Sequence, residues 1–301
     1  MPIQVDQEGG HFKVGVDEQK NYENLSHMGT CIDVEGYKIH YYEEGEGQPL
    51  LLVHGIGQSI YTWRNNIQDL STYFRVIAID MIGCGQSDKP ELEYSIRNNC
   101  EFLRAFLDAM EIETIHIVAF SSGAIQVLDF IQNYPERIEK VVLISPGGLT
   151  RYYPMLDKLL AIRYIGDFCS ALLNPSWMRK RLLECFFDET NVTDKMVEKL
   201  YKPFMNRDCK GAMLSNLHSW NDSEVFAGLG TISHSILLVW GQNDQWHPSS
   251  MMSIYEEGLQ NLKIQMIRNC GHLAHEEKYR EFNLNLLEFI TGEKFEKQGN
   301  G

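Results

Sequence analysis

The sequence predicts an α/β fold in which a mostly parallel sheet is covered by helices on both faces. Mainly apolar segments of strand length alternate with longer segments of helical periodicity. The strand-like segments include 50–53, 74–79, 114–118, 141–144 and 235–240. Strands that are buried on both faces have such continuous apolar runs, and the helices between them form the crossovers of a parallel sheet.

Further elements precede or interrupt this alternation. Residues 1–28 are polar and weakly patterned, and we expect them to form an N-terminal extension. Residues 31–34 and 37–42 predict an antiparallel hairpin that turns at a Glu-Gly pair. Apolar residues recur at helical spacing within 98–111, which predicts an amphipathic helix against the sheet.

A run of Ala-Phe-Ser-Ser-Gly between an apolar strand and a helical segment predicts a nucleophile elbow. In such a turn, strand and helix pass closely, so the residues two before and two after the nucleophile must be small. Ala119 and Gly123 meet this requirement for Ser121. The alternative nucleophile, Ser122, would place Phe120 in one of the tight positions. Ser121 is therefore the candidate nucleophile.

Two further residues complete a candidate triad with Ser121. A serine hydroxyl is a poor nucleophile until a base removes its proton, and the base needs an acid to orient it. Asp244 follows the apolar strand 235–240, and His272 follows the strand 262–267. Serine, acid and histidine thus occur in this order, each just beyond the carboxyl end of a strand.

The segment His-Gly-Ile-Gly at 54–57 predicts a loop that binds the oxyanion, because its glycines let the backbone approach a substrate closely. We expect the amides of Ile56 and of Ser122, at the start of the elbow helix, to be the two donors. Gly55 of the same loop should line the substrate pocket.

Four other histidines suit supporting roles better than the role of the base. His54 begins the oxyanion loop and should brace it. His116 lies inside an apolar strand and should be a core histidine whose hydrogen bonds are satisfied. His275 lies one helical turn beyond the candidate base and should support that loop together with the two glutamates that follow it. His247, close to the acid in sequence, could line the pocket.

Together these motifs resemble the capped members of the α/β-hydrolase fold superfamily, which include esterases, lactonases, C–C bond hydrolases, haloalkane dehalogenases and epoxide hydrolases. The resemblance implies a mostly parallel eight-stranded sheet in a core formed by 29–147 and 226–295, with an inserted helical cap at 148–225. Dehalogenases and epoxide hydrolases place an aspartate where Ser121 stands. The serine therefore argues for acyl chemistry.

The expected cap lies across the edge of the sheet that carries the triad, so it should shape the substrate pocket. Helices are expected at 155–164, 175–187 and 194–205. Trp246, two residues beyond the acid, is a pocket candidate by location, and Phe120 makes the elbow more apolar than in the many relatives that carry histidine there. Cap side chains that could line the pocket, or simply hold the cap together, are Tyr152, Tyr153, Phe168, Trp177, Met178, Phe186 and Phe187.

The charge balance limits the partners of this chain. The 301 residues include 27 Lys and Arg against 41 Asp and Glu, a net charge of -14, which disfavours nucleic acid and anionic membranes. Residues 151–210, within the expected cap, carry a small positive excess. A positive cap could favour substrates with a carboxylate, whereas solvated helix faces are the simpler explanation.

The sequence also carries no signal for a metal, a cofactor or a membrane. The seven cysteines are scattered without metal-ligand spacing, which fits free thiols, and neither a phosphate-binding loop nor a ligand cluster is present. No apolar run approaches the length of a membrane span, and the first residues lack the pattern of a signal peptide. We therefore expect a cytoplasmic monomer or homodimer without cofactors.

The primary functional hypothesis is a serine hydrolase that cleaves a small, largely apolar ester, lactone or thioester through an acyl-enzyme. The same triad serves C–C bond hydrolysis, peptide cleavage of the proline iminopeptidase type, and biosynthetic cyclase or lyase steps. A third class comprises non-catalytic ligand-binding receptors of this fold. Pocket shape distinguishes these classes, so all three stay open at the level of the sequence.

Overall fold

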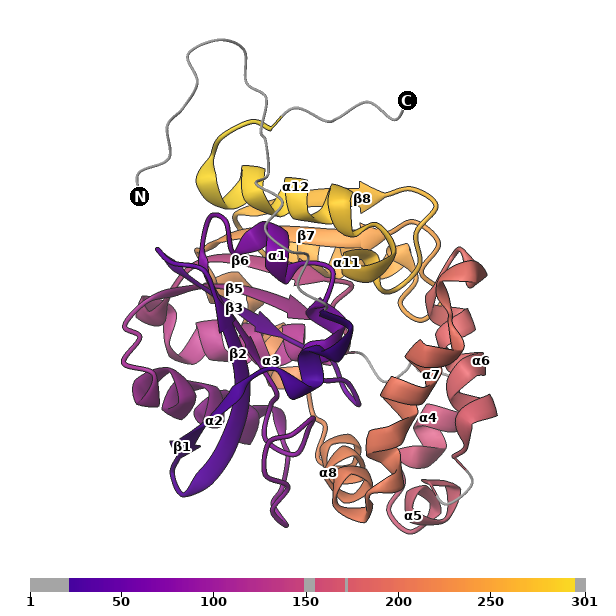
Figure 1. Cartoon of the computed structure of the whole chain (residues 1–301). Coiled ribbons are helices and arrows are strands. Elements are labelled where there is room, and N and C mark those ends of the chain that lie inside the picture. The colour runs from indigo at the N-terminus through magenta and orange to yellow at the C-terminus, as the bar shows by residue number, and fades with distance from the viewer. Residues whose placement is uncertain (1–21, 149–154, 171–172, 296–301) are drawn as a thin grey trace.

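The computed structural model describes residues 22–148, 155–170 and 173–295, which form a sheet-based core and a helical cap (Figure 1). The core is one eight-stranded sheet of order β1-β2-β4-β3-β5-β6-β7-β8. The first two strands form the expected hairpin and β2 pairs antiparallel with β4, while all other neighbouring strands are parallel. The strands are β1 (Thr30–Val34), β2 (Tyr37–Glu44), β3 (Pro49–Val53), β4 (Arg75–Ile79), β5 (Ile115–Phe120), β6 (Ile138–Ile144), β7 (Ser235–Gly241) and β8 (Leu262–Ile267).

Helices cover both faces of the sheet, as the alternating pattern predicts (Figure 1). One face is covered by α2 (Ile96–Ala109), α3 (Ser122–Asn133), α9 (Ser223–Ala227) and α10 (Met252–Gly258), and the other by α1 (Ile67–Leu70), α11 (Ala274–Glu277) and α12 (Tyr279–Thr291). Along β3, Leu51 packs into one apolar cluster and Leu52 into the other, because successive strand residues point to opposite faces. In the described ranges, no helix has the length and hydropathy needed to cross a bilayer.

Short 3-10 helices join these elements. They are η1 (Tyr22–His27), η2 (Ile60–Trp63), η3 (Pro135–Arg137), η5 (Glu189–Asn191), η6 (Lys202–Met205), η7 (Leu229–Thr231) and η8 (Ser249–Met251). Tyr22 and Leu25 of η1 are buried in the apolar cluster that also holds Trp63 of η2. The described end of the expected N-terminal extension therefore packs against the core.

Between β6 and α9 the chain forms the cap, which lies beside the carboxyl ends of the strands (Figure 1). Its helices are α4 (Met155–Leu160), α5 (Ile165–Ser170), α6 (Pro175–Cys185), α7 (Asp194–Tyr201) and α8 (Arg207–His218). α4, α6 and α7 begin where helices are expected but end earlier. After α7 the chain continues as η6, because Pro203 has no N–H for a helical hydrogen bond. Val225 of α9 already packs into the core.

Candidate active site

Ser121 occupies a strained turn between β5 and α3. Its backbone φ is +53°, a region that residues other than glycine rarely adopt, and such strain is typical of a nucleophile elbow. The turn is held by hydrogen bonds from the Ser121 N–H to the Ile144 carbonyl and from the Gly147 N–H to the Ser121 carbonyl, at 3.0 and 2.9 Å. A Cβ at Gly123 would clash with the carbonyl oxygen of His54, which is the steric reason for a small residue there.

Three side chains from separate strand ends meet at this turn. The Oγ of Ser121 lies 3.2 Å from Nε2 of His272, and Nδ1 of His272 lies 2.7 Å from Oδ2 of Asp244. All three are buried. Burial alone would raise the pKa of Asp244, but the charge and hydrogen bond of His272 outweigh it and hold that pKa below its usual value. The ionised carboxylate can orient the imidazole and stabilise its protonated form.

Backbone groups fix the orientation of this acid and base. Oδ1 of Asp244 accepts hydrogen bonds from the N–H groups of Trp246 and His247, at 2.9 and 2.8 Å, so the other oxygen faces His272. The N–H of His272 donates to the carbonyl of Cys185 at 2.7 Å, at the end of the cap helix α6. The cap therefore contacts the candidate base directly.

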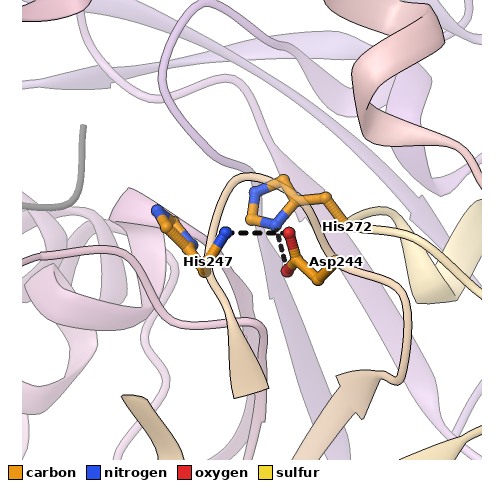
Figure 2. A group of neighbouring side chains, drawn as sticks. All are labelled: Asp244, His247 and His272. Atoms are coloured by element: carbon orange, nitrogen blue, oxygen red, sulfur yellow. Dashed lines mark hydrogen bonds and ion pairs between the residues drawn. The ribbon is translucent and has the colours of Figure 1, made fainter. Parts of the chain in front are cut away.

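Figure 2 shows a second imidazole, that of His247, beside this pair. Its ring lies edge-on against His272 with centroids 4.6 Å apart, and its Nδ1 is 3.1 Å from the Ser145 carbonyl. Burial, and then the neighbouring His272, lower its pKa to about 4, so it is neutral at pH 7. Its position in the wall of the cavity matches the pocket-lining role that its place in the sequence suggests.

Among the described residues, one group has the spacing of a metal site. It consists of Asp244, His247 and His272, whose nearest potential ligand atoms lie within 4.8 Å of one another (Figure 2). The carboxylate and the imidazole of this group already bond to each other at 2.7 Å. This arrangement is the one that a serine, histidine and aspartate triad requires, so we interpret Asp244 and His272 as members of a triad and not as metal ligands.

The two expected oxyanion donors lie next to Ser121. Ile56 and Ser122 both line the cavity, and their backbone N–H groups donate to none of the described residues. A Cβ on Gly55 would lie 3.1 Å from the Cβ of Ser121, so the loop backbone approaches the nucleophile closely. Both amides are thus available for a substrate oxygen.

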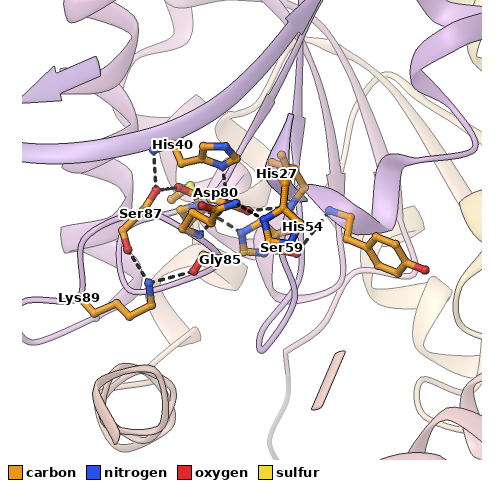
Figure 3. A network of polar contacts seen from close by, with 12 residues as sticks. His27, His40, His54, Ser59, Asp80, Gly85, Ser87 and Lys89 are labelled. Atoms are coloured by element: carbon orange, nitrogen blue, oxygen red, sulfur yellow. Dashed lines mark hydrogen bonds and ion pairs between the residues drawn. The ribbon is translucent and has the colours of Figure 1, made fainter. Parts of the chain in front are cut away.

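A buried carboxylate, Asp80 at the end of β4, links three segments near this loop (Figure 3). It accepts hydrogen bonds from Nδ1 of His40 and from the N–H groups of Ile60 and Gln86, at 2.7–2.8 Å. Burial alone would raise the pKa of Asp80. These hydrogen bonds, first that from His40, outweigh the effect of burial and hold the pKa below its usual value. The sequence analysis assigns no role to Asp80. Its position between an apolar strand and a glycine-rich loop is the feature of the sequence that could have indicated one.

Two other histidines, His54 and His275, brace the site, whereas His116 lies at the start of β5. His54 donates from Nδ1 to the Gly55 carbonyl at 2.8 Å and accepts at Nε2 from the N–H of Met81. Nε2 of His275 lies 2.7 Å from Oγ1 of Thr62, which links the loop after His272 to η2. His116 is a buried strand residue, as expected, but the expectation that its hydrogen bonds are satisfied is wrong: its Nδ1 has no hydrogen-bond partner among the described residues, and its Nε2 is 3.7 Å from Glu139.

Two cavities, called here the apolar lobe and the polar lobe, lie beside the oxyanion loop and share part of their walls. The apolar lobe, of about 160 Å³, contacts Ser121 and His272, and the polar lobe, of about 50 Å³, extends to the other side of the oxyanion loop. Both lobes share the walls formed by residues 55–58 and 122 together with two cap residues, Phe204 and Met213.

The structure places all four expected pocket residues in the wall of the apolar lobe: Gly55, Phe120, Trp177 and Trp246. Among the wider set of cap candidates, Met178 also lines it. Phe168 and Phe187 are instead 70% and 47% exposed, and Phe186 is buried in the packing beneath the cap. Tyr152 and Tyr153 lie outside the described residues.

Known hydrolases are similar to this chain over most of its length. A 2-hydroxy-6-oxo-6-phenylhexa-2,4-dienoate hydrolase of Comamonas testosteroni is 28% identical over 273 residues, which cover 86% of this chain and 93% of the relative. A 2-hydroxymuconate semialdehyde hydrolase of Pseudomonas sp. (strain CF600) is 26% identical over a match that covers 89% of this chain and 96% of the relative.

Experimental structures agree with this similarity. The meta-cleavage product hydrolase of Pseudomonas fluorescens IP01 superimposes with a TM-score of 0.76 at 26% identity, covering 89% of this chain and 99% of its own. The family model of the alpha/beta hydrolase fold matches residues 48–279, which span both halves of the core and the cap. This chain therefore belongs to the alpha/beta hydrolase fold family.

Proposed function

We propose that this protein is a serine hydrolase that cleaves a C–C bond next to a ketone through an acyl-enzyme on Ser121. The observation that carries the proposal is the hydrogen-bonded series from Ser121 through His272 to Asp244, which opens onto the cavity. The names of the similar hydrolases favour a ketone or aldehyde carbonyl over an ester, because each refers to a 6-oxo compound or a semialdehyde.

The proposed reaction follows from the positions of these groups. His272 removes the proton of Ser121 while the serine oxygen bonds to the ketone carbon, and the amides of Ile56 and Ser122 hold the resulting oxyanion. The substrate reacts as its 2-oxo tautomer, in which the proton of the 2-hydroxyl has moved to the carbon that departs. The C–C bond then breaks, its electron pair is delocalised over the departing fragment as a dienolate, and His272 returns the proton to that fragment. Water, activated by His272, finally releases the acid from Ser121.

Ester, lactone or thioester hydrolysis is the second candidate. It uses the same attack and the same acyl-enzyme, and differs in that an oxygen or sulfur leaves instead of carbon. The large apolar lobe beside Ser121 and His272 favours an apolar acyl group in either case.

The two candidates are separated by assaying one substrate of each class. Purified protein is incubated with 2-hydroxy-6-oxo-6-phenylhexa-2,4-dienoate and, separately, with p-nitrophenyl butyrate, and the products are quantified. We expect benzoate release from the first compound and a benzoyl adduct on Ser121 after rapid quenching. Hydrolysis of the ester with no cleavage of the dienoate would instead establish the second candidate.

A further inference from the structure

A buried carboxylate outside the triad lies where the cap meets the loop that carries His272. It belongs to Glu277, the last residue of α11, which is only 9% exposed. Glutamate is almost never buried unless its charge is compensated. No Lys or Arg of the described residues forms an ion pair with Glu277. Hydrogen-bond donors must therefore satisfy its oxygens.

Backbone N–H groups from two separate segments bind both oxygens of Glu277. Oε2 accepts from the N–H of Gly271 at 2.7 Å and from that of Phe187 at 3.2 Å. Oε1 accepts from the N–H of Asp188 at 2.7 Å. Gly271 lies in the loop after β8, and the other two donors directly follow the cap helix α6. Hydrogen bonds to a carboxylate are stronger than neutral ones, so Glu277 joins this loop to the cap.

The same two segments are in direct backbone contact. A Cβ at Gly271 would clash with the carbonyl oxygen of Cys185, so a larger residue does not fit there without a shift. The next residue, His272, donates its N–H to that carbonyl at 2.7 Å. Successive N–H groups of the loop are thus fixed by Glu277 and by the end of α6. Because α6 also supplies Trp177 to the wall of the apolar lobe, this junction links the base to that wall.

The imidazole of His272 tolerates little displacement. It must reach Oδ2 of Asp244, at 2.7 Å, and Oγ of Ser121, at 3.2 Å, at the same time. Its ring is also stacked on that of Trp246, with centroids 5.7 Å apart. A misplacement of about 1 Å in an active site can cost a factor of about 100 in rate. The groups that fix the backbone of this loop should therefore affect catalysis.

The neighbouring glutamate of α11 shows that burial on this helix does not by itself create such a link. Glu276 is 5% exposed, accepts from Oγ1 of Thr62 at 2.5 Å and forms an ion pair with Arg64 at 2.6 Å. Both partners belong to the core, at η2 and directly after it. The two adjacent carboxylates of α11 thus hold different segments, and Glu277 is the one bound to the loop of His272.

We propose that Glu277 is a positioning residue for the base. Its carboxylate holds the loop of His272 against the end of α6 and so keeps the imidazole between Ser121 and Asp244. Glu277 lines neither lobe, so its effect on the reaction passes through the backbone at Gly271. The proposal rests on the proposed function in its use of His272 as the base, and it holds equally for a C–C bond and for an ester.

The test measures the rate at which a fluorophosphonate labels Ser121, because this reaction needs only the nucleophile and its base. Glu277→Ala removes all three hydrogen bonds, so labelling should slow by about 100-fold. Glu277→Gln should restore the rate to within roughly tenfold of the wild type. Its amide oxygen can still accept from Gly271 and Phe187, and only the bond from Asp188 is lost.

A spectroscopic readout and a matched variant separate positioning from stability. The downfield proton resonance of the hydrogen bond between His272 and Asp244, assigned by its absence in His272→Ala, should shift or broaden in both Glu277 variants. Glu276→Gln takes the charge partner from the buried Arg64, so it should lower the melting temperature. It should leave the labelling rate and the resonance unchanged. If Glu277→Ala does not fold, Glu277→Gln provides both readouts.

Two results would overturn the proposal. One is a wild-type labelling rate and resonance in the Glu277 variants, with only a lower melting temperature, since Glu277 would then be purely structural. The other is an equal slowing in Glu276→Gln, which would attribute the effect to lost stability. If the wild type is labelled but does not cleave 2-hydroxy-6-oxo-6-phenylhexa-2,4-dienoate, the proposed C–C reaction fails and the inference on Glu277 stands.

Discussion

The core edge and the cap line the same cavity, but they are built differently. At the core edge, the ends of β5, β7 and β8 place Ser121, Asp244 and His272, and backbone hydrogen bonds fix each of them. The cap contributes side chains from α6, α7 and α8 that pack around the space in front of the triad. The proposed chemistry thus depends on short, local backbone motifs, whereas selectivity depends on packing between distant segments.

The two regions are nevertheless joined at His272, the candidate catalytic base. Because the N–H of His272 donates to Cys185 at the end of α6, a shift of this cap helix would move the loop that carries the imidazole. Substitutions at the core edge should therefore change the rate of the chemical step, and substitutions in the cap wall should mainly change substrate binding.

The largest effect is expected for Ser121→Ala. Without the hydroxyl no acyl-enzyme can form, so kcat should fall by roughly 10⁶-fold, measured with the best substrate found. Ser122→Ala is the matched control, because it keeps the backbone N–H of the oxyanion site, and it should retain most of the activity. Equal losses in both variants would contradict the division of roles at this turn.

The second largest effect is expected for Asp244→Asn, whose kcat should fall by about 10⁴-fold. An amide in this position cannot stabilise the protonated imidazole and favours the wrong tautomer of His272. The fold should be unchanged, which circular dichroism and a thermal melt can establish. A variant with nearly full kcat would mean that another group orients His272.

Low pH should lower the free energy of unfolding, because the core edge contains buried histidines that are neutral in the folded protein. The pKa of His247 in the folded protein is about 4, below that of a free histidine, so the folded state binds fewer protons than the unfolded state between pH 6.5 and 4. The free energy of unfolding should therefore fall as the pH drops through this range, by about 2 kcal/mol for this residue at pH 5. Burial lowers the pKa of His54 and His275 in the same direction.

Urea denaturation at pH 7 and pH 5 measures this effect. His247→Val should reduce the difference between the two pH values by about 2 kcal/mol, and His27→Ala, at an exposed position, should leave it unchanged. An identical pH dependence in wild type and His247→Val would show that His247 does not need to be neutral in the folded protein.

The smallest effect on activity is expected from the cap wall. Trp177→Ala removes an aromatic side chain from the apolar lobe, so KM should rise roughly tenfold with little change in kcat. Phe168→Ala, at a position 70% exposed on the same cap, is the matched control and should leave both constants unchanged. A fall in kcat alone for Trp177→Ala would place this side chain with the chemical step.

The sequence predicts the core edge well for a physical reason. The requirements at Ser121 are local: a small residue at Gly123, an apolar strand before it and a helix after it all lie within a short window. The same kind of local argument favours His272 over His275 as the base, because a strand and a glycine directly precede His272. The structure brings Asp244 and His272 together because both follow neighbouring parallel strands.

The cavity walls are less predictable, because they depend on contacts between segments far apart in the chain. Phe168, Phe186 and Trp177 are all aromatic cap residues, yet the first is exposed, the second packs beneath the cap and the third lines the cavity. Asp80 and Asn216 are likewise silent in the sequence, since their partners come from other elements.

The most direct test of the central claim is covalent labelling of Ser121. Wild-type protein is incubated with a fluorophosphonate, digested and mapped by mass spectrometry, with Ser121→Ala and His272→Ala as controls. The triad predicts a single phosphonyl adduct on the peptide that contains Ser121, its absence in Ser121→Ala and much slower labelling in His272→Ala. An unlabelled wild-type protein, or an adduct on another residue, would contradict the proposed nucleophile and leave a hydrolase fold without this chemistry.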